Sequence, residues 1–214
     1  MDYKQLMKDI KNKEISKVYL FYGEEFLLSQ MMLDNLKKAI IKPEFEQLNF
    51  HTIDGKNATT EEIINACETL PFMDDTRLVV VSEIPLLSGT SNFSTKDVDR
   101  LCDYIGQVPG GCHLIFTSKK IDKKRKLVKA IEKHGALVEY SKLDKRDLSK
   151  WIAKRFKLEG KSIGESALQL FIESSDYLNK DSKANLSDIE NEIKTIGQHL
   201  TGTIGQVLTD RRRL

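Results

Sequence analysis

The sequence contains no long hydrophobic run and almost no excess of charge of either sign. No apolar stretch approaches the roughly 20 residues that a membrane-spanning helix requires, and the start, MDYKQLMKDIKNKE, is charged where a secretory signal is apolar. The 34 lysines and arginines are balanced by 32 aspartates and glutamates, so the net charge of +2 favours neither nucleic acid nor a membrane as partner. We therefore expect a cytoplasmic protein without membrane contact.

Cysteine and histidine are scarce, which argues against several kinds of site. The three cysteines, Cys67, Cys102 and Cys112, are odd in number and lie far apart in apolar segments, so we predict reduced, buried thiols rather than disulfides. The four histidines lack the HxxxH or HExxH spacing of metal sites, and no GxSxG motif is present. We predict no catalytic residue, no metal site and no cofactor.

The first 142 residues alternate between apolar runs typical of buried strands and helical periodicity. The predicted strands are residues 18–22, 47–54, 77–81, 112–116 and 136–140. Between them lie a helix that begins at Thr59 with capping-box spacing to Glu62, a helix at about 98–105, and the segment DKKRKLVKAIEKHG, which ends at Gly135. Because parallel strands require long crossover connections, we predict a five-stranded parallel α/β domain over residues 1–142.

One helix carries a predicted inward stripe of Ile63, Ala66, Cys67 and Leu70, before Pro71 disfavours its continuation. Beyond residue 142 no strand pattern recurs. Three apolar stripes at helical spacing, the first of which includes the single Trp151, predict a small helical domain over residues 143–214 in which Trp151 packs in the core. The final LTDRRRL has no recognisable packing pattern.

The stretch VYLFYGEEFLLSQ has the strand-turn-helix outline of a phosphate-binding loop. A GxxxxGK[ST] loop supplies glycines that expose backbone N–H groups, a lysine for phosphate charge and a hydroxyl for magnesium. Here the last three of those positions are Leu28, Ser29 and Gln30, and Glu24 and Glu25 add negative charge where a polyphosphate binds. We expect this stretch to be architecture without phosphate chemistry.

The metal-binding half of such a site is also incomplete. In nucleoside triphosphatases an acidic residue at the end of the third core strand holds magnesium. In this sequence RLVVVSE places Ser82 first and Glu83 after it. ATP hydrolysis is therefore not expected, and a P-loop enzyme with an atypical loop is kept as an alternative hypothesis.

An apolar run interrupts a segment where a polar connection is expected. The sequence TLPFMDD contains Leu70, Pro71, Phe72 and Met73 between a helix end and a strand. Either these residues fold back to cap the core, or they form an exposed hydrophobic wedge that inserts into a pocket on a partner.

A lysine-rich run follows the fourth predicted strand. Its cations include Lys119, Lys120, Lys123, Lys124 and Arg125, with a single aspartate among them. The run is either a solvated outer helix face or a surface that contacts nucleic-acid phosphates. A DNA-binding module that uses this run is a third functional hypothesis, although no aromatic residue interleaves it to stack on bases.

Five segments in order carry a family resemblance. They are VYLFYGEEFLLSQ, LPFMDDTRLVVVSE, HLIFTSKKIDKKRKLVKAIEKHGALVEY, SKLDKRDLSKWIAKRFKLEGKSI and NLSDIENEIKTI. From about Lys17 to about Ile196 the chain resembles the delta subunit of bacterial DNA polymerase III, the clamp-loader subunit that opens the sliding clamp. The resemblance implies an AAA+-like fold without a working nucleotide site, followed by a small lid-like helical domain.

The resemblance also implies partners and a binding site. The hydrophobic clamp-binding element of that family corresponds here to Leu70, Pro71, Phe72 and Met73. The implied partners are the sliding clamp (beta), the ATPase and delta-prime subunits of the loader, and primer-template DNA through the complex. The chain alone is not expected to be an enzyme, only a component of the DNA polymerase III holoenzyme, a DNA-directed DNA polymerase.

Two departures from the family pattern bear on these expectations. The family has a third, C-terminal collar domain through which the loader subunits assemble, and this chain ends soon after the second domain. We therefore expect clamp binding to survive and pentamer assembly not to. Pro71 also stands where other members have a different apolar residue, which leaves open which side chain provides most of the wedge.

Overall fold

The computed structural model describes residues 1–89 and 93–199. These residues form two compact units, Met1–Tyr140 and a helical unit that begins at Ser141. The final LTDRRRL segment lies outside the described residues. None of the described helices is both long enough and apolar enough to cross a membrane.

The first unit is built on a five-stranded sheet in which every paired strand is parallel to its neighbour. The strands are β1 (Val18–Tyr22), β2 (Phe50–Asp54), β3 (Arg77–Ser82), β4 (Cys112–Ser118) and β5 (Ala136–Glu139). Their order across the sheet is β2-β3-β4-β1-β5. The register places Leu20 beside Phe116 and Leu137, and Val81 beside Ile53 and Phe116. The prediction of a five-stranded parallel α/β domain is confirmed.

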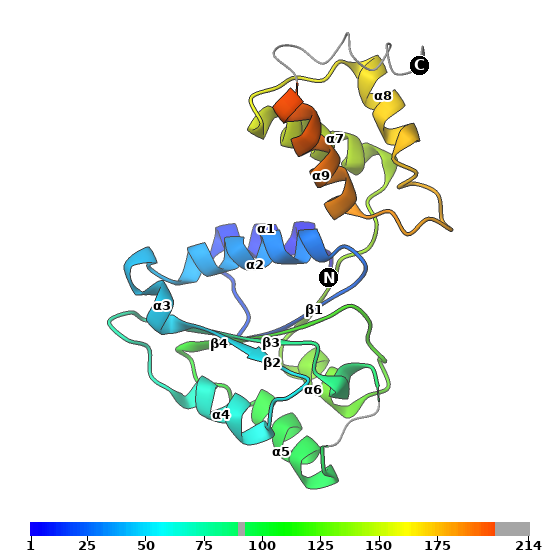
Figure 1. Cartoon of the computed structure of the whole chain (residues 1–214). Coiled ribbons are helices and arrows are strands. Elements are labelled where there is room, and N and C mark those ends of the chain that lie inside the picture. The colour runs from blue at the N-terminus through cyan, green and yellow to red at the C-terminus, as the bar shows by residue number, and fades with distance from the viewer. Residues whose placement is uncertain (90–92, 200–214) are drawn as a thin grey trace. The chain divides into compact units, whose positions relative to one another are not determined.

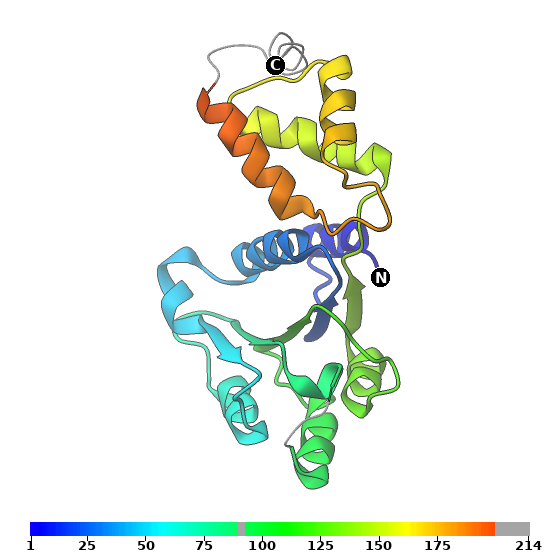
Figure 2. The same ribbon diagram turned by 45° about the vertical axis from the view of Figure 1, so that its right-hand side comes forward.

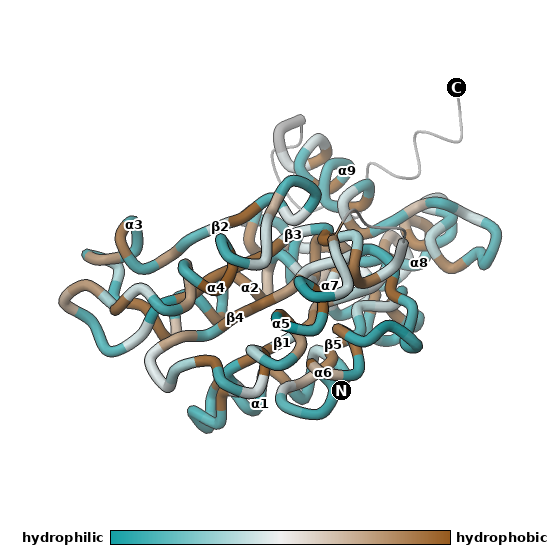
Figure 3. The backbone as a smooth tube through the Cα atoms, turned by 90° about the horizontal axis from the view of Figure 1, so that it is seen from below, coloured by the Kyte–Doolittle hydropathy of each residue, from teal (hydrophilic) through white to brown (hydrophobic). Residues whose placement is uncertain are grey.

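Helices cover both faces of this sheet, which explains why its central strands are continuous apolar runs. Helices α1 and α2 lie over one face, and α4, α5 and α6 lie over the other (Figures 1 and 2). The helices are α1 (Tyr3–Asn12), α2 (Phe26–Ile40), η1 (Pro43–Phe45), α3 (Glu46–Asn49), α4 (Thr60–Glu68), η2 (Pro85–Leu87), α5 (Thr95–Ile105) and α6 (Lys126–His134). All seven residues of β4 are buried, and Figure 3 shows β3 and β4 in the brown of hydrophobic residues.

Side-chain oxygens cap several helices at their first turn. Thr59 accepts a hydrogen bond from the backbone N–H of Glu62, as the capping-box spacing predicted, and Ser94 accepts from Asp97 in the same way. Asp2 caps α1 by accepting from the backbone N–H of Gln5. Helix α1 was not predicted, although Tyr3, Leu6, Met7 and Ile10 follow the i, i+3, i+4, i+7 spacing of an amphipathic helix.

The predicted inward position of Leu70 is wrong. Helix α4 ends at Glu68, and Thr69 already has extended backbone angles. The residue before a proline disfavours the helical region, so Pro71 ends the stripe after Ile63, Ala66 and Cys67, which are buried as predicted. Leu70 is left outside the helix.

Two other boundaries differ from prediction. Helix α6 begins at Lys126 rather than near Asp122, because Asp122 forms a turn in which its backbone carbonyl accepts from the N–H of Arg125. Strand β2 begins at Phe50, and Leu48, predicted within that strand, lies in the short helix α3 with its side chain exposed.

The described part of the second unit, residues 141–199, contains three helices around a small core of its own. They are α7 (Lys145–Leu158), α8 (Glu165–Ser174) and α9 (Leu186–His199). Trp151 is buried on α7, as predicted, and Phe156 packs edge-on against Phe171 with ring centroids 5.7 Å apart. Arg155 of α7 pairs through its guanidinium with both carboxylate oxygens of the buried Glu190 on α9.

Candidate functional site

The apolar loop, defined here as residues 70–73, connects α4 to β3 and projects into solvent. Leu70 is 84% exposed, Phe72 52% and Met73 69%, whereas Pro71 is half-buried. The loop therefore does not fold back over the core. Soluble proteins normally expose large apolar side chains singly, and several gathered in one loop are typical of a binding surface.

The fully buried side chain of Asn49 fixes the backbone of Phe72 by two hydrogen bonds. The Asn49 Oδ1 atom accepts a hydrogen bond from the Phe72 N–H at 2.7 Å, and the Asn49 Nδ2 atom donates to the Phe72 carbonyl at 3.0 Å. The ring of Phe45 packs edge-on against the ring of Phe72, with centroids 6.4 Å apart. Phe72 thus has a fixed main chain and a supported ring.

Asp74 fixes the far end of the apolar loop. Its carboxylate accepts from the backbone N–H of Lys42 at 2.8 Å and from that of Asp75 at 2.8 Å, and the Lys42 ammonium lies 3.5 Å from it. The backbone hydrogen bond from Lys42, with smaller contributions from Asp75 and the Lys42 charge, lowers the pKa of Asp74 below its ordinary value. The carboxylate stays ionised, and therefore bonded, at neutral pH.

Arg77 ties the base of the loop to two neighbouring helices. Its Nε atom donates to the Ala66 carbonyl at 2.9 Å, near the end of α4, and its Nη1 atom donates to the Leu48 carbonyl at 3.0 Å in α3. Unpaired carbonyls at helix ends are normally satisfied by such donors. Helix α4, helix α3 and strand β3 are thereby joined around the loop.

Because these contacts already fix the backbone of the loop, its apolar side chains can be presented to a partner without ordering of the loop on binding. Fixing a loop in its bound conformation before association lowers the entropy cost of binding. A pocket on another protein would therefore receive Phe72 on a nearly rigid support. Sequence reasoning found the apolar residues but missed Asn49, whose contact with Phe72 joins residues 23 positions apart.

The stretch at Gly23 that has the outline of a phosphate-binding loop is hydrogen-bonded to the chain at the ends of β4 and β5. The backbone N–H of Gly23 donates to the Ser118 carbonyl and that of Glu25 donates to the Tyr140 carbonyl at 3.0 Å. The hollow beside Gly23, Ser29 and Lys119 measures about 10 Å³, about the room that one water needs. Backbone N–H groups that a phosphate would require are thus already bonded within the protein.

The acidic residue after β3 has a structural contact. The Glu83 carboxylate accepts from the backbone N–H of Lys119 at 3.1 Å, and Glu83 has a positive φ of 55°. Among the described residues, no group of three or more His, Cys, Asp or Glu side chains is placed to hold a metal ion.

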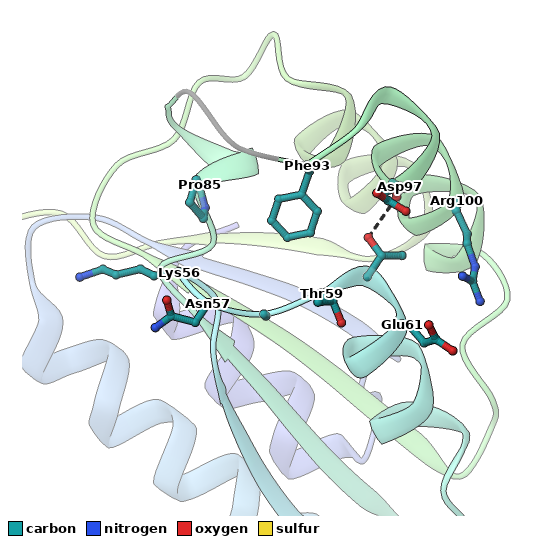
Figure 4. Close-up of a pocket in the computed structure, with 10 residues that line it drawn as sticks. Lys56, Asn57, Thr59, Glu61, Pro85, Phe93, Asp97 and Arg100 are labelled. Carbon is teal, nitrogen blue, oxygen red and sulfur yellow. Dashed lines mark hydrogen bonds between the residues drawn. The ribbon is translucent and has the colours of Figure 1, made fainter.

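A hollow of about 540 Å³ lies near the carboxyl ends of β2 and β3, with Lys56, Glu61, Phe93 and Arg100 in its wall (Figure 4). Two of its polar residues, Thr60 and Asp97, are hydrogen-bonded within the protein. The Thr60 hydroxyl donates to the Asp97 carbonyl at 3.1 Å, the contact dashed in Figure 4. The Asp97 carboxylate accepts from the Ser94 hydroxyl at 2.6 Å. These contacts build the hollow but do not converge on a ligand position.

The lysine-rich run forms the loop between β4 and α6 rather than a helix face. Its exposed members are Lys119, Lys120, Lys123 and Lys124, and Arg125 is half-buried at the start of α6. The Asp122 carboxylate accepts from the backbone N–H of Lys124 at 2.9 Å and lies 3.6 Å from Arg125. The loop therefore carries a net positive charge, with the aspartate used locally.

The three cysteines are free thiols, as predicted. Cys67 and Cys112 are buried, and Cys102 is half-buried rather than fully buried. Hydrogen bonding with Cys112 and burial raise the pKa of the Cys67 thiol. Burial, with a contribution from Asp99, raises the pKa of Cys102. Raised values keep these two thiols protonated and unreactive.

Residues 19–141 match the family model described as DNA polymerase III, delta subunit. Over 167 residues the chain is 29% identical to DNA polymerase III subunit delta of Bacillus subtilis (strain 168), a match that covers 76% of this chain and 48% of that protein. The chain therefore spans about half the length of the curated relative it matches.

Solved structures show the same likeness. The Bacillus subtilis DNA clamp loader delta protein matches with a TM-score of 0.67 and 25% identity, over 94% of this chain and 57% of that one. A DNA polymerase III gamma subunit-related protein from Thermotoga maritima matches with a TM-score of 0.53 and 14% identity, over 91% and 59% of the two chains, which shows the fold alone. The AAA+-like fold expected from the resemblance is confirmed.

Proposed function

Because this chain belongs to the DNA polymerase III delta subunit family, we propose that it binds and opens the sliding clamp through Leu70, Pro71, Phe72 and Met73, without ATPase activity of its own. The observation that carries this proposal is the apolar loop, with three exposed apolar side chains on a backbone fixed by Asn49 and Asp74. A partner pocket that buries these side chains removes apolar surface from water, which is the main favourable term in protein association.

In the proposed mechanism Phe72 enters a hydrophobic pocket on the clamp, with Leu70 or Met73 beside it. The end of α4 lies directly before the loop, so docking brings that helix end against the clamp surface. Pressure of α4 at the interface between clamp subunits then favours the open ring. Binding energy can shift a closed ring toward an open one only to the extent that the open ring is bound more tightly.

Nucleotide chemistry is assigned to other subunits of the loader. The small hollow at Gly23 and the bonds of the Gly23 and Glu25 N–H groups to Ser118 and Tyr140 support a subunit that does not bind ATP. The expected result is no saturable, magnesium-dependent ATP binding by the purified chain. Binding that responds to substitution of Glu83 would favour the alternative of an atypical P-loop enzyme.

The central test is a binding measurement between this chain and the sliding clamp of the same organism. Truncation of a buried aromatic anchor costs about 2 kcal/mol or more, so Phe72→Ala should weaken binding by roughly 30-fold or more. Phe26→Ala is a matched control, because Phe26 is an exposed phenylalanine of the same unit outside the loop. Equal affinity of the wild type and Phe72→Ala for the clamp would rule out the assignment of the wedge.

A DNA contact by the lysine-rich run is a second candidate function. The four exposed lysines of the β4–α6 loop favour it. Primer-template DNA titrated at several salt concentrations should bind with a salt dependence that decreases when Lys119, Lys120, Lys123 and Lys124 are replaced by glutamine. An unchanged salt dependence of the DNA affinity would show that these lysines do not contact DNA and are only solvated.

A further inference from the structure

The turn before β2, defined here as residues 45–49 (Phe45 and the short helix α3), is structurally joined to the apolar loop. Asn49 is fully buried and binds both backbone polar groups of Phe72, at 2.7 and 3.0 Å. Phe45 supports the Phe72 ring edge-on. Arg77 donates to the Leu48 carbonyl at 3.0 Å. The two segments, far apart in sequence, therefore form one surface.

Asn49 has a specific task because the apolar loop has an unfavourable backbone conformation. Met73 has a positive φ of 51°, a region that residues with a Cβ adopt at a cost. Hydrogen bonds from outside the loop must therefore select this conformation. Asn49 bonds the backbone of Phe72, the residue before Met73. Asp74, the residue after Met73, is held by the hydrogen bond that its carboxylate accepts from the backbone N–H of Lys42.

Leu48 is an exposed apolar residue of the same segment as Phe45 and Asn49. Its side chain is 53% exposed, although the next residue, Asn49, is fully buried. The hydrogen bond from Arg77 fixes the Leu48 backbone to the base of the loop. Leu48 thus shares the rigid support of Leu70, Phe72 and Met73 without packing in the core.

We propose that residues 45–49 are a second half of the clamp-binding surface, in which Asn49 is a positioning residue that holds Phe72 in its binding conformation and Leu48 is an additional apolar contact. This inference rests on the proposed function and adds to it. The occupant is the clamp surface that surrounds the pocket for Phe72, because the turn is continuous with the loop through three of its five residues.

The role of Asn49 is tested by a double-mutant cycle on clamp affinity. Asn49→Ala should weaken binding by about tenfold in the wild type. In a Phe72→Ala background the same change should weaken binding by a smaller factor, about threefold, because Asn49 then positions only the remaining apolar side chains of the loop. Equal effects in the two backgrounds would overturn the positioning role.

Thermal unfolding separates positioning from general destabilisation. Asn49→Ala removes a buried side chain, so each variant is compared by its affinity at a temperature where circular dichroism shows it folded. Asn49→Asp keeps the acceptor for the Phe72 N–H but sets a buried carboxylate oxygen against the Phe72 carbonyl, so its affinity should be no higher than that of Asn49→Ala. A wild-type affinity of Asn49→Asp would contradict the hydrogen-bond explanation.

The role of Leu48 is tested on a variant that does not threaten folding. Leu48→Ala should weaken clamp binding by about fivefold in both the wild type and the Phe72→Ala background, because its contact is independent. Leu158→Ala is the matched control, since Leu158 is an exposed leucine of the helical unit. An unchanged affinity of Leu48→Ala would remove Leu48 from the surface.

The outcomes distinguish this inference from the proposed function. Loss of affinity in Phe72→Ala with no effect of Asn49→Ala or Leu48→Ala would retain the clamp-binding loop and reject only the second half of the surface. No binding of the wild type to the clamp, or no effect of Phe72→Ala, would reject the proposed function itself.

Discussion

The carboxylate of Asp74 accepts a hydrogen bond from the backbone N–H of Lys42 at 2.8 Å, across 32 positions of sequence. Lys42 follows the end of α2, and Asp74 follows the apolar loop. The Thr76 hydroxyl also donates to the Ile40 carbonyl, at the end of α2. The end of the loop is therefore fixed to the helix that covers the opposite face of the sheet from α4.

Replacement of Asp74 should loosen the apolar loop without unfolding the protein. Asp74→Ala removes two backbone hydrogen bonds and an ion pair, so the free energy of unfolding should fall by about 1 kcal/mol and clamp affinity by severalfold. Asp75→Ala is the neighbouring control, since Asp75 is exposed. Chemical denaturation and clamp binding, measured side by side, check both effects. Equal losses in the two variants would contradict a specific role of Asp74.

The same contact predicts an acid-sensitive loop. The pKa of Asp74 is lowered in the folded protein, first by the hydrogen bond from the Lys42 N–H. Its stabilising contribution is therefore complete above the ordinary aspartate pKa, near 4, and is lost as pH falls through the lower folded value. Amide hydrogen exchange of Lys42 should accelerate at that acidic end beyond its intrinsic pH trend, and Asp74→Asn should abolish this additional change.

The regular elements could be predicted from the sequence because their signals are local. Buried strands appear as apolar runs, and the Thr59 cap appears as a residue pair three positions apart. The contacts that fix the apolar loop are not local, since Asn49 and Asp74 reach partners 23 and 32 positions away. A single sequence does not show which distant polar group satisfies a loop.

The contacts around Gly23 were similarly predictable only in part. Leu28, Ser29 and Gln30 indicated which functional groups are missing. The Tyr140 carbonyl, which accepts the Glu25 N–H, comes from the chain after β5 and depends on the strand order. Leu70 was wrongly predicted to lie on the inward face of α4, because the apolar periodicity continues past Glu68, where the helix ends before Pro71.

A side chain at Gly23 should destabilise the first unit. Gly23 has a φ of +134°, and a Cβ atom there would lie 2.3 Å from the Tyr140 carbonyl oxygen. Gly23→Ala should lower the free energy of unfolding by about 2 kcal/mol or more, because both the backbone angles and the contact are unfavourable. Gly110→Ala is the control, since nothing lies within 4 Å of a Cβ at Gly110. Similar stabilities of the two variants, measured by denaturation, would contradict this packing.

The buried ion pair of the helical unit should be costly to break. The buried Glu190 carboxylate accepts hydrogen bonds from the Nε and Nη2 atoms of Arg155, and the Lys194 ammonium lies 3.5 Å away. Glu190→Gln leaves the half-buried guanidinium without its countercharge and should cost about 3 kcal/mol. Glu173→Gln, an exposed substitution on α8, is the control. Trp151 is the single tryptophan and packs beside Arg155, so its fluorescence reports unfolding of this unit. Coincident unfolding curves for the two variants would contradict the role of the pair.

His113 should make the first unit less stable at mildly acidic pH. The imidazole is buried and its Nδ1 atom donates to the Ser16 carbonyl at 2.9 Å. Burial, with a smaller contribution from the Lys17 charge, lowers the pKa of His113 below 6.5. The unfolded chain therefore binds a proton that the folded chain resists, so stability is complete above about pH 6.5 and falls as pH falls through the folded value.

His113→Gln keeps an N–H donor near Ser16 but does not titrate. Between pH 7.5 and pH 5.5 the melting temperature of the wild type should fall by about 3 °C more than that of His113→Gln. His51→Gln removes an exposed histidine and should retain the wild-type pH dependence. A His113→Gln variant with the same pH dependence as the wild type would show that another group takes up the proton, because the substitution removes only the imidazole that the fold keeps neutral.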